Sequence, residues 1–271
     1  IASHPEVDMI SFTGSTQGGI AVAELAAKSV KRVSQELGGK AANILLDDVD
    51  FETAVDRGIR LCFRNSGQSC NSPSRMLVPK KRLDQVISFA KTSVNLIKVG
   101  YPIDDGVDLG PVVSCKQWES IQSFINIGIR EGATLIAGGP NRPDGFDSGY
   151  FVKPTIFSGV TSDMTISKEE IFGPVLCIMT YENEDHAIQI ANETPFGLAA
   201  YVESSDLSRA RSVAGRIRAG MVHLNGAVAD PGAPFGGYRM SGNGREWGAY
   251  GLEEFLEKKA VMGYSTKENR E

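Results

Sequence analysis

Histidine and cysteine are scarce in this chain, which has three histidines and four cysteines among its 271 residues. The histidines are not spaced as metal ligands are, and the cysteines form no CxxC pair, so we expect no metal site. Sparse cysteine in a chain of this size is typical of a reduced, intracellular protein, and we expect a cytoplasmic one. The four cysteines are Cys62, Cys70, Cys115 and Cys177.

Long apolar runs and strong charge are also missing. No stretch approaches the roughly 20 apolar residues that a membrane helix needs, and the N-terminus shows no signal peptide. The net charge of -5, without a long basic run, gives no general attraction to nucleic acid or anionic membrane. We therefore expect a small-molecule partner and neither nucleic acid nor membrane.

The first residue is Ile1 and not methionine, and the residues that follow resemble the middle of an α/β unit. This opening predicts a fragment of a longer polypeptide. Apolar residues make up 41% and charged residues 23%, as in an ordinary soluble globular protein. The chain is long enough to bury a sizeable core.

Short apolar runs alternate with segments of helical spacing, which predicts an α/β fold with a mainly parallel sheet covered by helices on both faces. A Gly-rich turn at 14–19 separates the first strand from the first helix. The predicted strands are 9–13, 31–37, 42–46, 134–137, 175–181, 198–203, 221–224 and 260–264. The predicted helices are 20–27, 51–65, 82–99, 117–131, 184–193 and 207–218.

Cys70 follows a Gly-containing loop, Asn65-Ser66-Gly67-Gln68-Ser69. Such a loop can bring backbone amides close to a ligand. A nucleophilic thiol needs access, local positive potential and N–H groups that hold an oxyanion. For an isolated cysteine, the simpler interpretation is a small buried side chain. The neighbouring motifs decide between the two.

Six short motifs occur in one order along the chain. Each is weak alone, whereas six in one order at domain-scale spacings are highly specific. The motifs are SFTGSTQGG (11–19), QELGGK (35–40), NSGQSC (65–70), EEIFGPV (169–175), PFGGYRMSGNGRE (234–246) and YGLEEF (250–255).

Together these motifs resemble the C-terminal part of the aldehyde dehydrogenase superfamily, over about residues 1–265. The resemblance implies that Cys70 attacks the aldehyde carbonyl and that a thioester follows loss of hydride. It assigns the general base that activates water to Glu36. Without the motif, Glu36 would be interpreted as a solvated or capping acid.

The resemblance also implies NAD or NADP as cofactor. The turn at Gly14 and Ser15 is similar to the stretch that approaches the pyrophosphate, although alone it would be a plain strand–helix turn. Leu37 and Gly38 match positions beside the nicotinamide. Glu170 and Phe172 match residues that hold the nicotinamide ribose and pack beside the ring; without the motif they would be a loop acid and a core aromatic.

Two residues are candidates for substrate binding. Phe235 matches a residue that lines the family's substrate tunnel, whose mouth we expect at 226–233; the alternative is a core phenylalanine at a turn. Arg64, six residues before Cys70, resembles an arginine that binds the substrate carboxylate in succinic semialdehyde dehydrogenase. The interpretation that we favour from the residues alone is an arginine at a helix end with a packed stem.

The resemblance divides the chain into three parts. Residues 1–38 would be the end of a Rossmann-like nucleotide-binding domain, 39–240 the catalytic domain, and 241–271 a return segment with an oligomerisation strand at about 256–267. An unpaired strand edge suits a homodimer or homotetramer.

Three functions remain open. One is a hydrolytic NAD(P)-dependent aldehyde dehydrogenase, which Glu36 favours. Another is a coenzyme-A-acylating relative, in which a thiol resolves the thioester. The last is an inactive truncated fragment, since the family's asparagine oxyanion donor and earlier cofactor strands match nothing in this chain.

Overall fold

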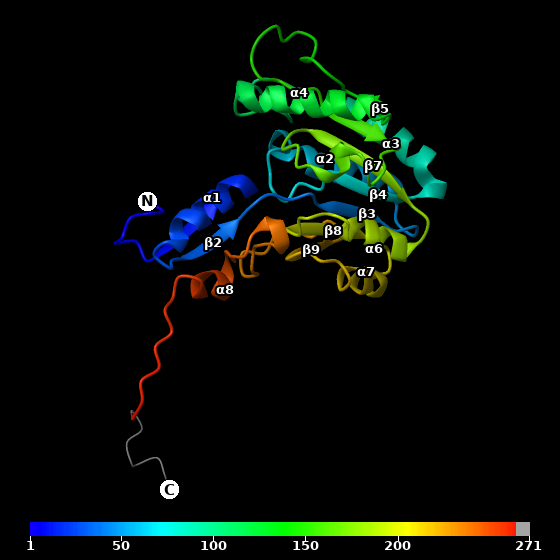
Figure 1. The fold of residues 1–271 in the computed structure, drawn as a ribbon. Coiled ribbons are helices and arrows are strands. Elements are labelled where there is room, and N and C mark those ends of the chain that lie inside the picture. Colours follow the sequence, from blue (N-terminus) through cyan, green and yellow to red (C-terminus); the bar gives the residue numbers. More distant parts are fainter. Residues whose placement is uncertain (264–271) are drawn as a thin grey trace.

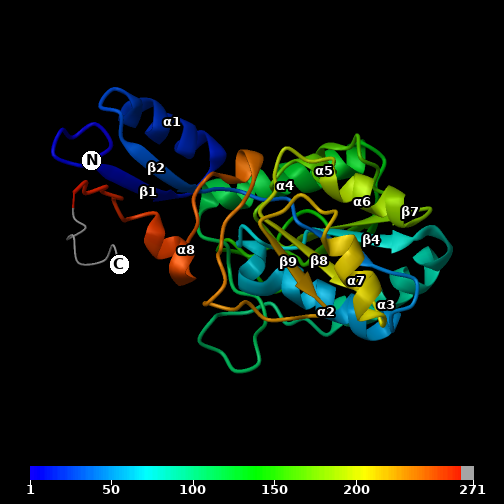
Figure 2. The same cartoon turned by 90° about the horizontal axis from the view of Figure 1, so that it is seen from below.

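The computed structural model describes residues 1–263, which form two sheets that follow one another along the chain (Figure 1). The small sheet pairs β1 (Met9–Thr13) with β2 (Arg32–Glu36) in parallel, and α1 (Thr16–Ala27) makes the crossover between them. Ser15 caps α1, because its Oγ accepts the Gly18 amide at 3.2 Å. This small unit lies at one end of the molecule, close to α8 (Gly248–Glu253) (Figure 2).

A seven-stranded sheet forms the rest of the fold. Neighbouring strands are parallel except for the antiparallel pair β5–β6 at one edge. The prediction of an α/β fold with a mainly parallel sheet is therefore confirmed. In spatial order the strands are β5 (Thr134–Ala137), β6 (Thr155–Ser158), β7 (Val175–Tyr181), β4 (Arg75–Pro79), β3 (Ala42–Leu45), β8 (Ala199–Glu203) and β9 (Met221–Leu224).

Helices cover both faces of this sheet. Side chains alternate along each strand, so Leu45 and Leu176 pack on one face and Ile44 and Val175 on the other. The first face is covered by α2 (Phe51–Phe63) and α3 (Leu83–Asn95). The second face is covered by α4 (Cys115–Arg130), α5 (Thr165–Lys168), α6 (Glu184–Asn192) and α7 (Leu207–Ala214).

Several elements differ from the sequence-based expectation. Strands β4 and β6 were not predicted, and α3 and α7 end four residues earlier than expected. Residues 256–263 form no strand, and Tyr264, the last residue of the strand expected at 260–264, lies outside the described residues. No helix within residues 1–263 is both long and apolar enough to cross a membrane.

Candidate active site

Three segments that are distant in sequence meet where the two sheets join. Glu36 ends β2, and the buried residues 37–41 then lead directly into β3. Cys70 lies just before β4, and Glu170 lies just before β7. The site thus lies at the carboxyl ends of the strands of the small sheet and at the amino ends of the central strands of the large sheet.

Two glycines bring these segments into contact. The Gly39 amide donates to Oε1 of Glu170 at 2.9 Å. A Cβ on Gly38 would lie 2.2 Å from Oε2 of Glu170, and a Cβ on Gly39 would lie 2.3 Å from the Cys70 carbonyl oxygen. Because real Cβ atoms do not approach so closely, only glycine at both positions allows the nucleophile loop and the carboxylate to pack on this segment.

The loop before Cys70 has a strained backbone. Asn65, Ser66 and Gly67 follow one another in the left-handed region, with φ of 54°, 55° and 71°. Such a conformation is unfavourable for residues other than glycine, and it persists only where the surroundings enforce it. A Cβ on Gly67 would lie 2.1 Å from the Gly173 carbonyl oxygen, so the loop is also pressed against the segment that carries Glu170.

Side-chain hydrogen bonds hold this strained loop in place. Ser66 Oγ donates to the Gly110 carbonyl at 2.8 Å. Gln68 accepts the Val113 amide on its Oε1 at 2.9 Å, and its own carbonyl accepts from Asn65 Nδ2 at 2.9 Å. The sulfur that follows is therefore presented from a fixed turn.

Cys70 is half-buried, and its electrostatic surroundings are negative. Burial raises the pKa of its thiol to about 11, with further increases from the Glu170 and Glu36 carboxylates and a decrease from the Asn71 amide. The positive potential that would activate a thiol is therefore not supplied by the carboxylates around Cys70. A base must take the thiol proton before sulfur can attack at neutral pH.

Glu36 is a buried carboxyl without a hydrogen-bond partner. The residue is 3% exposed, and neither Oε1 nor Oε2 has a hydrogen-bond partner among the described residues. Burial raises its pKa from 4.5 to about 8; Glu246 raises it further, and Arg245 opposes the shift. A carboxyl with a pKa near neutrality can both accept and release a proton at the working pH, as a general base must.

Glu170 and Phe172 lie on the loop before β7. Burial raises the pKa of Glu170, while the Gly39 amide and the Lys40 ammonium lower it. Phe172 has a left-handed backbone with φ of 54°, and the residue is 37% exposed. A bulky residue in this conformation with a solvent-facing ring is an outlier of the kind found at binding sites.

The predicted pyrophosphate turn and the segment beside it have their own contacts. The Gly14 amide donates to the Glu36 carbonyl at 3.1 Å, so it links the turn to the site. Ser15 caps α1, which leaves the first-turn amides of Thr16 and Gln17 at the helix N-terminus. Leu37 is buried, and its amide donates to the Ser241 carbonyl at 3.0 Å.

The two predicted substrate residues have different surroundings. Phe235 packs against the buried cluster that includes Tyr201 and that also contacts Cys70, and its ring lies 4.8 Å from that of Trp247. Arg64 lines a cavity of about 550 Å³ together with Ser69.

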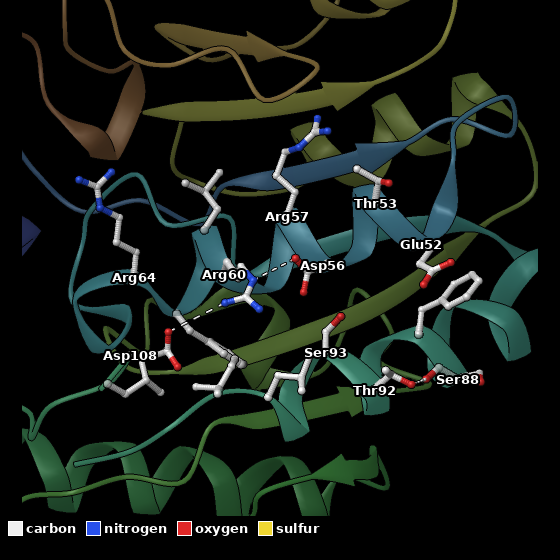
Figure 3. A pocket seen from close by; sticks show the side chains of 16 residues that line it. Glu52, Thr53, Asp56, Arg57, Arg60, Arg64, Ser88, Thr92, Ser93 and Asp108 are labelled. Carbon is white, nitrogen blue, oxygen red and sulfur yellow. Dashed lines mark hydrogen bonds and ion pairs between the residues drawn. The ribbon is translucent and has the colours of Figure 1, made fainter. Parts of the chain in front are cut away.

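Arg64 also lies at one end of a larger groove of about 1090 Å³ between α2 and α3 (Figure 3). In this groove Arg60 pairs with Asp56 at 2.9 Å and with Asp108 at 3.9 Å. Cys70, Glu36 and Glu170 line neither this groove nor the smaller cavity, but the smaller cavity is lined by Ser69 and Asn71, the two neighbours of Cys70. We therefore place the candidate site where the segments of Cys70, Glu36 and Glu170 meet, with the smaller cavity next to the nucleophile loop.

Sequence reasoning missed two buried supports of the site. Ser241 is fully buried; its Oγ donates to the Gly38 carbonyl at 2.6 Å and accepts the Gly197 amide at 3.0 Å. Lys40 is buried with no hydrogen-bond partner for its Nζ within residues 1–263, and burial lowers its pKa. Both residues lie inside quoted motifs, which mark their positions but not their contacts.

Comparisons with known proteins place these motifs in context. The model of the aldehyde dehydrogenase family matches residues 1–261. A 3-succinoylsemialdehyde-pyridine dehydrogenase from a Pseudomonas species is 59% identical over 264 residues, which cover 97% of this chain and 55% of that protein. A putative aldehyde dehydrogenase from Staphylococcus aureus is 49% identical over 97% of this chain and 56% of its own length.

Solved structures agree with the fold. A mutant of aldehyde dehydrogenase C from Pseudomonas syringae, complexed with NAD+ and octanal, is 53% identical with a TM-score of 0.96; the match covers 97% of this chain and 54% of that one. A Mycobacterium tuberculosis aldehyde dehydrogenase complexed with NAD+ is 42% identical with a TM-score of 0.94, over 98% and 55% of the two chains. The chain thus spans about half the length of the curated relatives that it matches.

Proposed function

Because the chain belongs to the aldehyde dehydrogenase family, we propose that the protein oxidises an aldehyde to a carboxylic acid with NAD+ or NADP+. The observation that carries the proposal is the meeting of Cys70, Glu36 and Glu170 at one point of the fold. These residues come from three separate segments, and the contacts of Gly38 and Gly39 hold the three segments together.

Cys70 is the proposed nucleophile. The thiol gives its proton to a water molecule or a buffer base. The thiolate sulfur then forms a bond to the aldehyde carbon as the C=O π bond opens, and its electron pair moves to the oxygen, which becomes an oxyanion. The Cys70 amide, fixed by the strained turn before it, is the proposed backbone donor to this oxyanion. The aldehyde hydrogen then departs as hydride, which leaves a thioester on Cys70.

Glu36 is the proposed general base. As a carboxylate it takes a proton from water, whose oxygen attacks the thioester carbon; the C–S bond breaks, the acid leaves and sulfur regains a proton. Its burial without a partner and its pKa of about 8 suit this role. A coenzyme-A-acylating enzyme would need no such base, so Glu36 favours the hydrolytic reaction.

The residues around the site fit a nicotinamide dinucleotide. Glu170 keeps Oε2 beyond its bond to Gly39 and would accept from a ribose hydroxyl, with Leu37 and Gly38 close by. The exposed ring of Phe172 would pack beside the nicotinamide. The turn at Gly14 and Ser15 and the N-terminus of α1 would face the pyrophosphate, since helix N-termini favour anions. When bound, the nicotinamide supplies the hydride acceptor.

The substrate is a small aldehyde that enters beside Arg64 and Phe235. Arg64 supplies a cation to the cavity lined by Ser69 and Asn71, and Phe235 supplies an aromatic ring to the cluster against which Cys70 packs. Arg64 would favour an aldehyde that carries a carboxylate or another acceptor. Replacing it in Arg64→Leu should raise KM for such an aldehyde more than for an unsubstituted alkyl aldehyde.

We also propose that copies of this protein assemble through α8 and the residues that follow it. Exposed apolar side chains gather there, and such patches mark interaction surfaces. Light scattering at a series of concentrations would show a dimer or tetramer, and a monomer throughout would contradict the proposal. The exposed residues are Tyr250, Leu252, Phe255, Leu256, Val261 and Met262.

The decisive experiment compares two cysteine variants of the protein as its gene encodes it. NADH and NADPH formation is followed with a panel of aldehydes in Cys70→Ser and in Cys115→Ser, whose thiol is exposed on α4. We expect loss of turnover in Cys70→Ser and wild-type turnover in Cys115→Ser. Oxidation at the wild-type rate in Cys70→Ser would refute the assigned chemistry.

A further inference from the structure

Tyr201 and His223 form a stacked pair on neighbouring strands near Cys70. They are register partners in the parallel pair β8–β9. Their ring centroids are 4.8 Å apart and their planes differ by 14°. Tyr201 is 6% exposed and belongs to the buried cluster that contacts Cys70. One ring of the stack therefore belongs to the cluster against which the nucleophile packs.

The Tyr201 hydroxyl reaches the chain just after the nucleophile. It donates to the Asn71 carbonyl at 3.0 Å, across 130 positions of sequence. Tyr201 also lines the cavity of about 550 Å³ with Ser69 and Asn71, the two neighbours of Cys70. A buried hydroxyl with this partner fixes the orientation of residue 71, because breaking the bond would leave a polar group without a partner.

The orientation of Asn71 matters because this residue directly follows the nucleophile in the chain and lines the same cavity as Tyr201. A fixed Asn71 carbonyl restricts the backbone on the C-terminal side of Cys70, and with it the placement of the sulfur. The Asn71 and Cys70 amides both lower the pKa of the Cys70 thiol, against the increases from burial and from the Glu170 and Glu36 carboxylates.

His223 stacks on the Tyr201 ring, and a hydrogen bond to a loop residue holds its own ring in place. Its Nδ1 lies 3.0 Å from the Ala227 carbonyl oxygen, so Nδ1 carries the proton in this contact. Its Nε2 is buried without a partner among the described residues. Ala227 belongs to the segment 226–233, where the mouth of the substrate cavity is expected.

We propose that Tyr201 is a positioning residue for Cys70 and that His223 braces it. The proposal rests on the proposed function, because it assumes that Cys70 is the nucleophile. It assigns no proton transfer to either ring. Tyr201 acts through Asn71, and His223 acts through Tyr201.

The test compares Tyr201→Phe with Tyr181→Phe. Tyr181 is also buried on a strand, and its hydroxyl donates to a backbone carbonyl, that of Leu45, at 2.8 Å. Both variants lose the same kind of bond, but Tyr181 belongs to the cluster beneath α4, α5, α6 and α7 and not to the one that contacts Cys70. The readout is the rate of Cys70 alkylation by iodoacetamide as a function of pH, from peptide mass spectrometry.

We expect roughly threefold to tenfold slower alkylation of Cys70 in Tyr201→Phe at pH 8, as the loss of one hydrogen bond allows. The midpoint of its pH profile should move upward. Tyr181→Phe should keep the wild-type profile although its thermal unfolding midpoint falls. His223→Leu, which keeps the Tyr201 hydroxyl, should shift the profile in the same direction by less.

Identical alkylation profiles in Tyr201→Phe and Tyr181→Phe would overturn the positioning role. A wild-type profile in His223→Leu would overturn the bracing role. This readout needs no turnover, so it is distinguishable from failure of the proposed function, which would show as full dehydrogenase activity in Cys70→Ser. Where turnover is measured, Tyr201→Phe should lower kcat and leave KM for the aldehyde nearly unchanged.

Discussion

The Gly39 amide donates to the Glu170 carboxylate at 2.9 Å, although 131 positions separate the two residues. The same glycine lies against the Cys70 carbonyl. One residue without a side chain therefore sets the separation between the proposed nucleophile and the proposed ribose-binding carboxylate. The following predictions concern this arrangement and the residues that support it.

Cys70 should be the slow but selective site of alkylation among the three cysteines inside the fold. Its pKa of about 11 implies that labelling by iodoacetamide rises with pH between 7 and 10, because the thiolate fraction grows. Cys62 and Cys177 are fully buried and should remain unlabelled. The measurement is peptide mass spectrometry in a Cys115→Ser background, which removes the exposed thiol. Faster labelling of Cys62 or Cys177 would contradict the assignment.

Glu36→Gln should slow thioester hydrolysis more than hydride transfer. Loss of a general base typically costs about 10²- to 10⁴-fold. In the wild type the steady rate should rise with pH up to about 8, where Glu36 becomes ionised, and the variant should lose this dependence. Stopped-flow absorbance should show a retained NADH burst followed by slow turnover. An equal fall in burst and steady rate would place the base elsewhere.

Glu36 should also make folding stability decrease with rising pH. Its folded-state pKa of about 8 exceeds the ordinary 4.5, so between these values the folded state holds a proton that the unfolded state has released. The free energy of unfolding contributed by this group is then fully present below pH 4.5 and is lost as pH rises through 8. Urea unfolding at pH 6 and pH 9 should show a smaller loss in Glu36→Gln than in wild type. A loss of equal size would mean that Glu36 does not carry the effect.

Gly67→Ala should destabilise the protein more than Gly132→Ala does. Both glycines have positive φ, 71° and 91°, so each alanine meets backbone strain of about 1–2 kcal/mol. Only at Gly67 would the new Cβ also collide with the Gly173 carbonyl; at Gly132 nothing lies within 4 Å. Chemical denaturation gives both values, and Cys70 alkylation should change in Gly67→Ala alone. Equal losses in the free energy of unfolding for the two variants would show that the loop can move to accommodate the new Cβ.

Ser241→Ala should destabilise the protein and perturb the site. The variant leaves the Gly38 carbonyl and the Gly197 amide without their buried partner, at about 1–3 kcal/mol for each group. Ser167→Ala is the matched control, since that buried hydroxyl donates only to the Met164 carbonyl. Thermal unfolding should rank the two variants, and only Ser241→Ala should weaken NAD+ binding in calorimetry. A smaller stability loss in Ser241→Ala than in Ser167→Ala would be evidence against a stabilising role for the two Ser241 hydrogen bonds.

The order of most elements could be predicted because hydrophobic spacing reports which side of a helix or strand is buried. Strand β4 was not predicted, although it lies at the centre of the sheet. It begins with Arg75, a fully buried side chain whose guanidinium donates to the carbonyls of Lys40, Ile190 and Ala191. The carbonyls that bind the Arg75 guanidinium come from distant parts of the chain, so the local sequence shows a charged residue and gives no sign of a buried strand.

In the site, too, local motifs predicted some residues, whereas contacts between distant segments were not predicted. Motifs pointed to Cys70 and Glu36, but the support from Tyr201 depends on a bond across 130 positions, which no local pattern encodes. The negative surroundings of Cys70 likewise arise from Glu170, a residue one hundred positions away. Contacts of this kind follow from the packing of the segments and not from their spacing in sequence.

The segment that connects the two sheets tolerates no change in length. Residues 37–41 are all buried, and they run without a break from the end of β2 to the start of β3. One inserted residue would turn every following side chain of β3 to the opposite face of the sheet and would withdraw Gly39 from Cys70. Substitutions elsewhere alter the rate or the substrate, whereas insertions and deletions in these five positions should be absent from any working copy of the protein.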